Sequence, residues 1–331
     1  MFWIEKYRPG RLSDIVGQDP IVRQLSSFAA SGTSPHLLLS GPHGTGKSVA
    51  VECFSRALYG ETQEQNTTVF QTADLFLQGK ALLEQDDRYS HIYQKSQSFI
   101  TNFKQIIRWY AALRPLDAGY KIMVFEDAHT LTRDAQQALR RTMERTSGTC
   151  RFIFTTTNPS ALIPAIRSRC LPLFFAPISD DIVLSRLRMI REAEMNSCGN
   201  SCTEDDIELI IQASGGDLRK AVMLLQAAME TGRCTELFDL SQSETATIAT
   251  GALSAIKDGQ AQAAIRRLES LMIEYGLSGR EVLGEIRLAA KRDYNHPALA
   301  IAIAESENRL LHANNEYIQI GALVAGIREV Y

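Results

Sequence analysis

A glycine-rich octapeptide at residues 41–48 constrains the fold of this chain more than any other feature. It follows a short apolar run at 37–39 and has the spacing GxxxxGK(S/T) directly before a stretch with helical spacing, Lys47 to Leu58. Glycines there let successive backbone N–H groups turn inward around phosphate groups, and the helix N-terminus adds a partial positive charge. We expect Lys47 to reach the β- and γ-phosphates of a nucleotide and the Ser48 hydroxyl to bind Mg²⁺. The predicted phosphate-binding residues are Gly41, Pro42, His43, Gly44, Thr45, Gly46, Lys47 and Ser48.

Short apolar runs and helical stretches alternate through the first half of the chain. This alternation predicts an α/β fold, in which a parallel sheet is covered by helices on both faces. The predicted strands are His36–Leu39, Lys121–Phe125, Arg151–Thr155 and Leu171–Phe175, and the helices between them include Lys47–Leu58, Phe99–Leu113 and Arg133–Thr146.

The pattern changes after residue 176, and nine of the ten prolines lie at or before Pro177. Amphipathic spacing then predicts three helices that form a small bundle, followed by several more helices up to the C-terminus. The three are Asp180–Glu194, Glu204–Ala213 and Asp217–Thr231. We therefore expect a nucleotide-binding domain over residues 1–176, a small helical domain over 177–234 and an all-helical domain over 235–331.

The charge balance excludes a free-standing electrostatic DNA-binding protein. The chain has 35 Lys+Arg and 38 Asp+Glu, a formal net charge of −3, and residues 235–331 carry 9 basic against 13 acidic residues. Sequence-independent binding of nucleic-acid phosphates needs an excess of basic side chains. Any nucleic-acid contact must therefore come from a local basic patch or from several chains together.

Neither a membrane segment nor a disulfide framework is indicated. No apolar run approaches the ~20 residues that cross a bilayer, so we expect no membrane association. The six cysteines are scattered along the chain, which favours a reducing cytosol. Cys198 and Cys202 lie four apart without a second Cys or His pair nearby, and this spacing does not favour a zinc site.

Two acids follow the predicted strand at 121–125. In a phosphate-loop enzyme one acid at this point holds Mg²⁺ through water and a second polarises the attacking water. The usual order is Asp then Glu, whereas here Glu126 precedes Asp127. Because a misplacement of ~1 Å can cost on the order of a hundredfold in rate, one interpretation is that ATP is bound but hydrolysed slowly. The alternative is that small backbone shifts restore full activity.

Several motifs occur in the order typical of one family. Besides the phosphate loop, they are Trp3-Ile-Glu-Lys-Tyr-Arg-Pro9, Asp14-Ile-Val-Gly-Gln18, Asp134-Ala-Gln-Gln-Ala-Leu-Arg-Arg-Thr-Met-Glu144, Asn158, Ser168-Arg-Cys170 and Gly215-Gly-Asp-Leu-Arg219. On these residues the chain resembles replication factor C small subunits of the archaeal kind, which are clamp-loader AAA+ ATPases. The resemblance covers essentially the whole length and implies an AAA+ domain, a helical lid and a helical collar for oligomerisation.

The resemblance assigns roles around a bound ATP. It implies that Tyr7, Arg8, Ile15 and Val16 line the adenine pocket. Asn158 is similar to the sensor that positions the attacking water, and Arg219 to the lid sensor for the nucleotide of its own subunit. Arg169 is similar to the arginine finger that acts on the ATP of a neighbouring subunit. The alternatives are a turn role for Asn158, a solvated helix position for Arg219 and a surface salt bridge for Arg169.

The resemblance also implies macromolecular partners. These are other replication factor C subunits in a hetero-pentamer, a PCNA-type sliding clamp and primer–template DNA. Basic residues of helix 133–146 would face DNA, and one face of helix 99–113 would press on the clamp, with Trp109 expected to pack. The alternative for the basic residues of helix 133–146 is a solvated face without DNA. The alternative for the face of helix 99–113 is a stripe buried in the core. The residues assigned to DNA are Arg133, Arg140 and Arg141, and those assigned to the clamp are Ile107, Tyr110 and Ala111.

Residues 71–101 depart from the family pattern, because this stretch is longer and more polar than in typical small subunits. Together with the inverted acids, the stretch favours a specialised, less active subunit. The main hypothesis is an ATP-driven subunit that opens the clamp and loads it on DNA, in the cytoplasm or in a eukaryotic nucleus. The alternatives are a slowly hydrolysing or non-catalytic ATP-sensing scaffold of the same loader and another DNA-associated AAA+ motor.

Overall fold

The chain divides into two compact units, Met1–Cys234 and Thr235–Tyr331, in a computed structural model. The described residues are 2–85, 89, 92–195, 202–232, 244–290, 297–310, 313 and 315–330. Cys198, one half of the cysteine pair considered above, lies outside them. Within these ranges no helix is long and apolar enough to cross a membrane.

A parallel sheet of five strands in the order β2-β3-β4-β1-β5 forms the centre of the first unit. This confirms the predicted α/β fold, and the four expected strands are present with their ends shifted by one residue or so. The strand Thr67–Gln71 was not predicted, because it lies at the sheet edge and only Phe70 is buried among its five residues. The strands are β1 His36–Ser40, β2 Thr67–Gln71, β3 Lys121–Glu126, β4 Cys150–Thr156 and β5 Cys170–Phe174.

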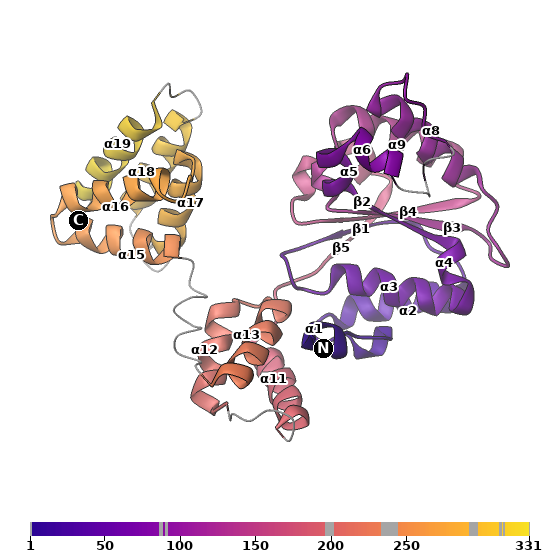
Figure 1. Cartoon of the computed structure of the whole chain (residues 1–331), viewed down its shortest axis with the longest axis horizontal. Helices are drawn as coiled ribbons and strands as arrows, with labels where there is room; N and C mark the ends of the chain where they lie inside the picture. Colours follow the sequence, from indigo (N-terminus) through magenta and orange to yellow (C-terminus); the bar gives the residue numbers. More distant parts are fainter. Residues whose placement is uncertain are drawn as a thin grey trace. The chain divides into compact units, whose positions relative to one another are not determined.

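Helices cover both faces of the sheet (Figure 1). Along β4, Phe152 and Phe154 point into the core under α8 and α9, whereas Ile153 points into the core under α2 and α3. This alternation follows from the two-residue period of a strand. The helices are α1 Trp3–Lys6, η1 Leu12–Asp14, α2 Asp19–Ser31, α3 Lys47–Tyr59, η2 Gly60–Thr62, α4 Gln63–Asn66, α5 Thr72–Gln78, α6 Lys80–Gln85, α8 Phe99–Ala112, η3 Ala128–Thr130, α9 Arg133–Arg145, η4 Pro159–Ala161 and α10 Pro164–Arg167.

Three further helices complete the first unit, at the positions predicted. They are α11 Asp180–Glu194, α12 Glu204–Ser214 and α13 Leu218–Thr231. The start of α12 is a capping box between Thr203 and Asp206, and α13 begins where the Asp217 side chain accepts a hydrogen bond from the Lys220 backbone N–H (3.0 Å). Such caps satisfy N–H groups that have no partner inside the helix.

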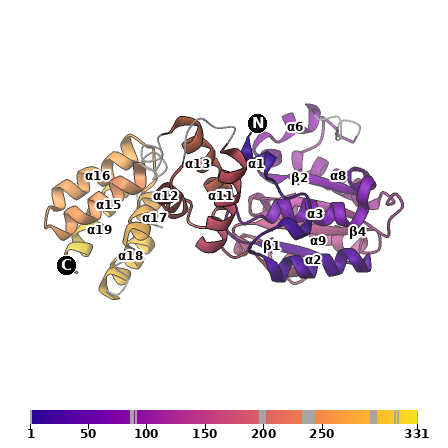
Figure 2. The same ribbon diagram turned by 90° about the horizontal axis from the view of Figure 1, so that it is seen from below.

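The described residues of the second unit form helices and the turns that connect them, as expected. Leu253, Leu268, Ile286 and Leu323 are among the residues of its common core. Figure 2 shows its helices grouped around that core. They are α15 Glu244–Lys257, α16 Ala261–Ile273, α17 Gly279–Ala289, α18 Pro297–Leu310 and α19 Glu316–Arg328.

Candidate functional site

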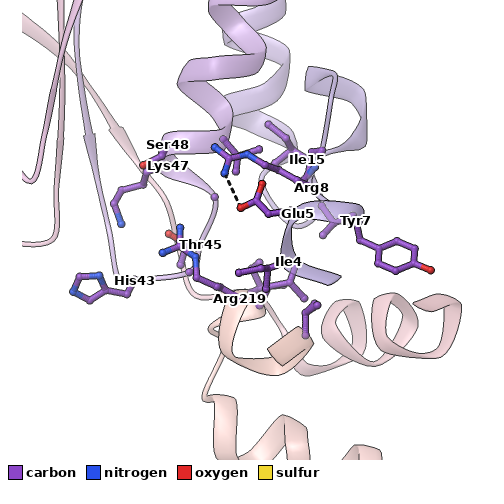
Figure 3. A pocket seen from close by; sticks show the side chains of 18 of the residues that line it. Ile4, Glu5, Tyr7, Arg8, Ile15, His43, Thr45, Lys47, Ser48 and Arg219 are labelled. Atoms are coloured by element: carbon purple, nitrogen blue, oxygen red, sulfur yellow. Dashed lines mark ion pairs between the residues drawn. The ribbon is translucent and has the colours of Figure 1, made fainter. Parts of the chain in front are cut away.

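The first unit contains a cavity of about 520 Å³. The N-terminal segment, the loop between β1 and α3 and the start of α13 surround it (Figure 3). The end of β3 also lines it, together with Gln71, Thr155, Ile178 and Arg186. Parallel strands end at the same edge of a sheet, and ligands of open α/β folds bind at that edge. Of the residues predicted to bind nucleotide, the cavity is lined by Tyr7, Arg8, Ile15, Val16, His43, Gly44, Thr45, Gly46, Lys47 and Ser48, whereas Gly41 and Pro42 lie outside its lining.

The loop after β1 takes a shape that requires glycine. Gly41, Gly44 and Gly46 all have positive φ, at +148°, +67° and +96°. A Cβ on Gly44 would lie 1.6 Å from Oδ1 of Asp217, and one on Gly41 would lie 2.1 Å from the carbonyl oxygen of Phe175. The Phe175 carbonyl leaves no room for a Cβ at Gly41, and a Cβ at Gly44 would force the Asp217 carboxylate to move. The motif spacing therefore reflects close approach as well as backbone turning.

Lys47 lies against the carbonyl groups of this loop. Its Nζ donates to the Gly41 oxygen at 2.7 Å and to the Pro42 oxygen at 2.5 Å. Burial lowers the pKa of Lys47 below its usual value, while the Asp127 carboxylate acts in the opposite direction. The cavity therefore contains a half-buried ammonium group at the helix N-terminus, which is a suitable environment for a phosphate anion.

Both acids at the end of β3 line the cavity. Glu126 accepts a hydrogen bond from Nε2 of Gln71 at 2.6 Å. Asp127 has φ +50°, a left-handed conformation that is costly for a residue with a side chain. The backbone oxygens of the two acids lie 2.5 and 2.8 Å from the Thr72 hydroxyl. The sequence does not indicate Gln71, which lines the cavity, or Thr72, the first residue of α5, because β2, which ends at Gln71, was not predicted.

The helical part of the first unit reaches the cavity through α13, and Arg186 of α11 also lines it. Arg219 lies in its first turn and lines the cavity, although the side chain is exposed. Asp217, which caps the same helix, packs against Gly44 of the phosphate loop. The structure thus brings Arg219 to the site, as the lid-sensor assignment requires.

The N-terminal segment forms another wall. The Arg8 guanidinium bonds to Glu52 of α3 (2.7 Å), and Glu5 lies 3.6 Å from Arg8. The ring of Tyr7 points away from the phosphate loop (Figure 3), and its hydroxyl donates to Glu194 of α11 at 2.6 Å. Burial, reinforced by Glu194, raises the pKa of Tyr7 to about 12.

Asn158 and Arg169 do not line this cavity. The Asn158 Oδ1 accepts from the Ser160 N–H at 3.2 Å and from its hydroxyl at 2.6 Å, so the residue caps η4, which is the turn role considered as the alternative. Thr155, in the strand β4 that precedes Asn158, lines the cavity instead. Arg169 forms an ion pair with Glu144 at 2.6 Å, and its action on another subunit stays a prediction.

The three arginines assigned to DNA lie on α9. Arg133 and Arg141 are exposed, and Arg140 is half-buried with its Nε 3.3 Å from Glu144. The Glu144 carboxylate thus contacts both Arg140 and Arg169 through one oxygen, and these contacts lower its pKa, Arg140 having the larger effect. The contact of these arginines with DNA remains a prediction.

The clamp assignment on α8 is wrong for two of its three residues. Ile107 is 1% exposed and Ala111 is fully buried, because this face of the helix packs on the sheet core. Tyr110 is partly buried against the same core. Trp109, expected to pack, lies edge-on against Tyr110 with ring centroids 4.9 Å apart, yet it is 40% exposed.

The fold and the site define a class of protein. A phosphate loop between β1 and α3, an acid pair at the end of β3 and an arginine at the start of α13 are the parts of an AAA+ ATPase. Solved structures with this fold include the RuvB Holliday junction branch migration motor of Thermotoga maritima, 16% identical, with a TM-score of 0.52 and 85% of each chain covered. Another is the ORC1 protein of Aeropyrum pernix in complex with DNA, 18% identical, with a TM-score of 0.50 and 81% of each chain covered.

Sequence comparison identifies the family. The model for DNA polymerase III, delta subunit, matches residues 17–179, and that for the replication factor C C-terminal domain matches residues 246–326. The replication factor C small subunit of Archaeoglobus fulgidus is 33% identical, with 98% of this chain and 96% of the relative covered. That of Methanocella arvoryzae is 34% identical, with 98% and 95% covered. The chain belongs to the replication factor C small-subunit family, a family of clamp-loader components, which confirms the resemblance.

Proposed function

We propose that this chain is an ATP-binding subunit of a clamp loader. It works in a hetero-pentameric ring that opens a PCNA-type clamp and places it on primer–template DNA, in the cytoplasm or in a eukaryotic nucleus. One observation carries the nucleotide-binding part of the proposal. A single cavity is lined by residues of the phosphate loop, the acid pair and Arg219, so one chain would supply the phosphate-binding, metal-binding and lid groups.

The residues around the cavity fit Mg²⁺ and ATP. Mg²⁺ prefers hard oxygen ligands, and the Ser48 hydroxyl and the Glu126 carboxylate supply them at one edge of the sheet. When bound, the metal would neutralise charge that develops on the phosphates. The backbone N–H groups at the start of α3 and the Lys47 ammonium would hold the phosphates. Arg219 would bring a fixed charge to the nucleotide from α13.

The same chemistry supports slow hydrolysis by this subunit alone. Asp127 stands where a longer Glu is usual, and Glu126 is engaged by Gln71. The general base must lie within hydrogen-bond reach of the attacking water, so a side chain one methylene shorter favours binding over turnover. Full activity after small backbone shifts is the second candidate.

Two proposals concern neighbouring molecules. Arg169 acts on the ATP of an adjacent subunit, for which it must leave Glu144; both side chains are partly exposed, and such pairs are easily broken. Arg133, Arg140 and Arg141 contact the DNA backbone, where repetition around a ring would turn a small patch into a basic groove.

ATP turnover of the chain alone and of the chain reconstituted with its partners tests the proposal. We expect little turnover alone, clamp- and DNA-dependent turnover in the assembly, and loss of ATP binding at this site in Lys47→Ala. Brisk hydrolysis by the isolated chain that Lys47→Ala abolishes would overturn slow hydrolysis. An assembly that forms without this chain and loads the clamp at the same rate would overturn the loader role.

A further inference from the structure

A buried carboxylate outside the phosphate site connects the N-terminal segment to α11. Glu194 is the last residue of α11 and is 3% exposed. One of its oxygens, Oε1, accepts from Nζ of Lys6 at 2.5 Å and from the hydroxyl of Tyr7 at 2.6 Å. No motif of the sequence indicates this residue, because its partners lie almost the length of the first unit away along the chain.

The electrostatics of Glu194 show that it is held as an anion. A carboxylate removed from water is unfavourable unless donors compensate it. Hydrogen bonds from Lys6 and then Tyr7 lower the pKa of Glu194, and burial followed by the effect of Glu194 raises that of Tyr7. At neutral pH the cluster is therefore a charged acceptor with two donors, which is the strong form of a hydrogen bond.

Two more bonds attach the same segment to the helices α11 and α13. The Trp3 backbone N–H donates to Oε1 of Gln226 in α13 at 2.8 Å, and the indole of Trp3 is buried. Nη2 of Arg186, in α11, donates to the Tyr7 backbone oxygen at 2.9 Å. The segment thus lies on α11 and on α13, the helix that carries Arg219, while the next residue, Arg8, bonds to Glu52 of α3.

We propose that Glu194 is a positioning residue for the nucleotide. By holding Lys6 and Tyr7 on α11, it fixes the N-terminal wall of the cavity in one arrangement relative to Arg219. A wall that is ordered before the ligand arrives does not have to be ordered on binding, and this preorganisation raises affinity. The inference rests on the proposed function, in that the cavity must bind an adenine nucleotide.

Calorimetric titration of the full chain with ADP tests the effect on affinity. We expect Glu194→Ala to raise the Kd by about tenfold, as for loss of a hydrogen bond to a charged group. Glu194→Gln, which keeps an acceptor but loses the charge, should fall between Glu194→Ala and the native chain. Glu204→Gln is the matched control. Glu204, in α12, accepts from Arg188 and Arg191 of α11, the helix that carries Glu194, but does not touch the N-terminal segment. It should leave the Kd unchanged.

Hydrogen exchange gives a second readout that needs no ligand. In Glu194→Ala the amides of residues 3–8 should exchange faster, while those of β1 and β4 keep their protection; a general loss of stability would move both. Lys6→Met removes one donor at a half-exposed position and carries the same test if the Glu194 variants do not fold.

The outcomes separate the inference from the proposed function. If the native chain does not bind ADP, or if Lys47→Ala binds it equally well, the nucleotide-binding proposal fails. If the native chain binds ADP and the Glu194 and Lys6 variants bind it with the native Kd, the positioning role is overturned. A Kd that rises equally in Glu204→Gln would likewise overturn it.

Discussion

The contact between Gly44 and Asp217 predicts a specific cost for a single added methyl group. Gly44 has φ +67°, and a Cβ there would lie 1.6 Å from Oδ1 of Asp217. The Asp217 carboxylate must then move, and it is the cap that accepts from the Lys220 N–H. Gly44→Ala therefore combines a backbone strain with the loss of a helix cap, and it also displaces the phosphate loop from α13.

Each part has a known size. A left-handed conformation costs a non-glycine residue about 1–2 kcal/mol, and loss of an N-cap costs about 1 kcal/mol. We expect Gly44→Ala to lower the free energy of unfolding by about 2–3 kcal/mol from these terms together. Gly32 offers a matched control, since its φ is +66° and a Cβ on it would meet nothing within 4 Å. Gly32→Ala should lower the free energy of unfolding only by the cost of the left-handed backbone conformation.

Urea unfolding followed by tryptophan fluorescence measures this cost. The chain has two tryptophans, Trp3 and Trp109, and both belong to the first unit, so the signal reports that unit. The Gly44→Ala, Asp217→Ala double variant should be less destabilised than the sum of its single variants, because the cap is lost only once. Equal losses in Gly44→Ala and Gly32→Ala, or strict additivity in the double variant, would refute the reasoning.

Three further predictions concern pH, the ring and the acids. Burial and the nearby Arg151 lower the pKa of His36 to about 4 from 6.5, while its Nδ1 accepts from the Phe152 N–H. Because the unfolded chain takes up this proton more readily, the contribution of His36 to the free energy of unfolding is complete above pH 6.5 and falls by up to about 3 kcal/mol as the pH drops to 4. Urea unfolding at several pH values measures this, and the free energy of unfolding should fall less steeply with decreasing pH in His36→Asn than in the native chain. An equal pH dependence in the two would count against the prediction. Arg169→Ala should slow single-turnover hydrolysis at the adjacent subunit by on the order of 10³, with ATP binding intact; an effect confined to the mutated chain's own site would contradict this. Exchanging the acids, Glu126→Asp with Asp127→Glu, should raise turnover by on the order of a hundredfold if misplacement limits it, whereas an unchanged rate would show the native order to be competent.

Local patterns predicted the parts of the fold that depend on local interactions. The phosphate loop, the central strands and the helices α11 to α13 are determined by glycine spacing, apolar runs and caps within a few residues, and all were predicted within a residue or so. β2 was missed because an edge strand with one buried side chain, Phe70, lacks a periodic signal. Because β2 was not predicted, the contacts of Gln71 and Thr72 with the acid pair were not predicted either.

Contacts between distant segments could not be predicted from local patterns. Spacing placed Ile107 and Ala111 on one face of α8, but spacing alone does not tell a buried face from a binding surface. Glu194 contacts Lys6 and Tyr7 from 188 and 187 residues away, and no periodicity links such positions. The resemblance assigned Asn158 to the sensor position. Its hydrogen bond with the Ser160 N–H shows that it caps η4, a role that the family motif does not indicate.

The subunit composition of the native complex tests the central claim most directly. Native mass spectrometry of the complex isolated through this chain, with and without Mg-ATP, reports its partners and bound nucleotide together. We predict a hetero-pentamer of replication factor C subunits that retains an adenine nucleotide on this chain, and that loses this nucleotide in Lys47→Ala while the ring stays intact. A chain recovered alone or as a homo-oligomer, without nucleotide, would contradict the account.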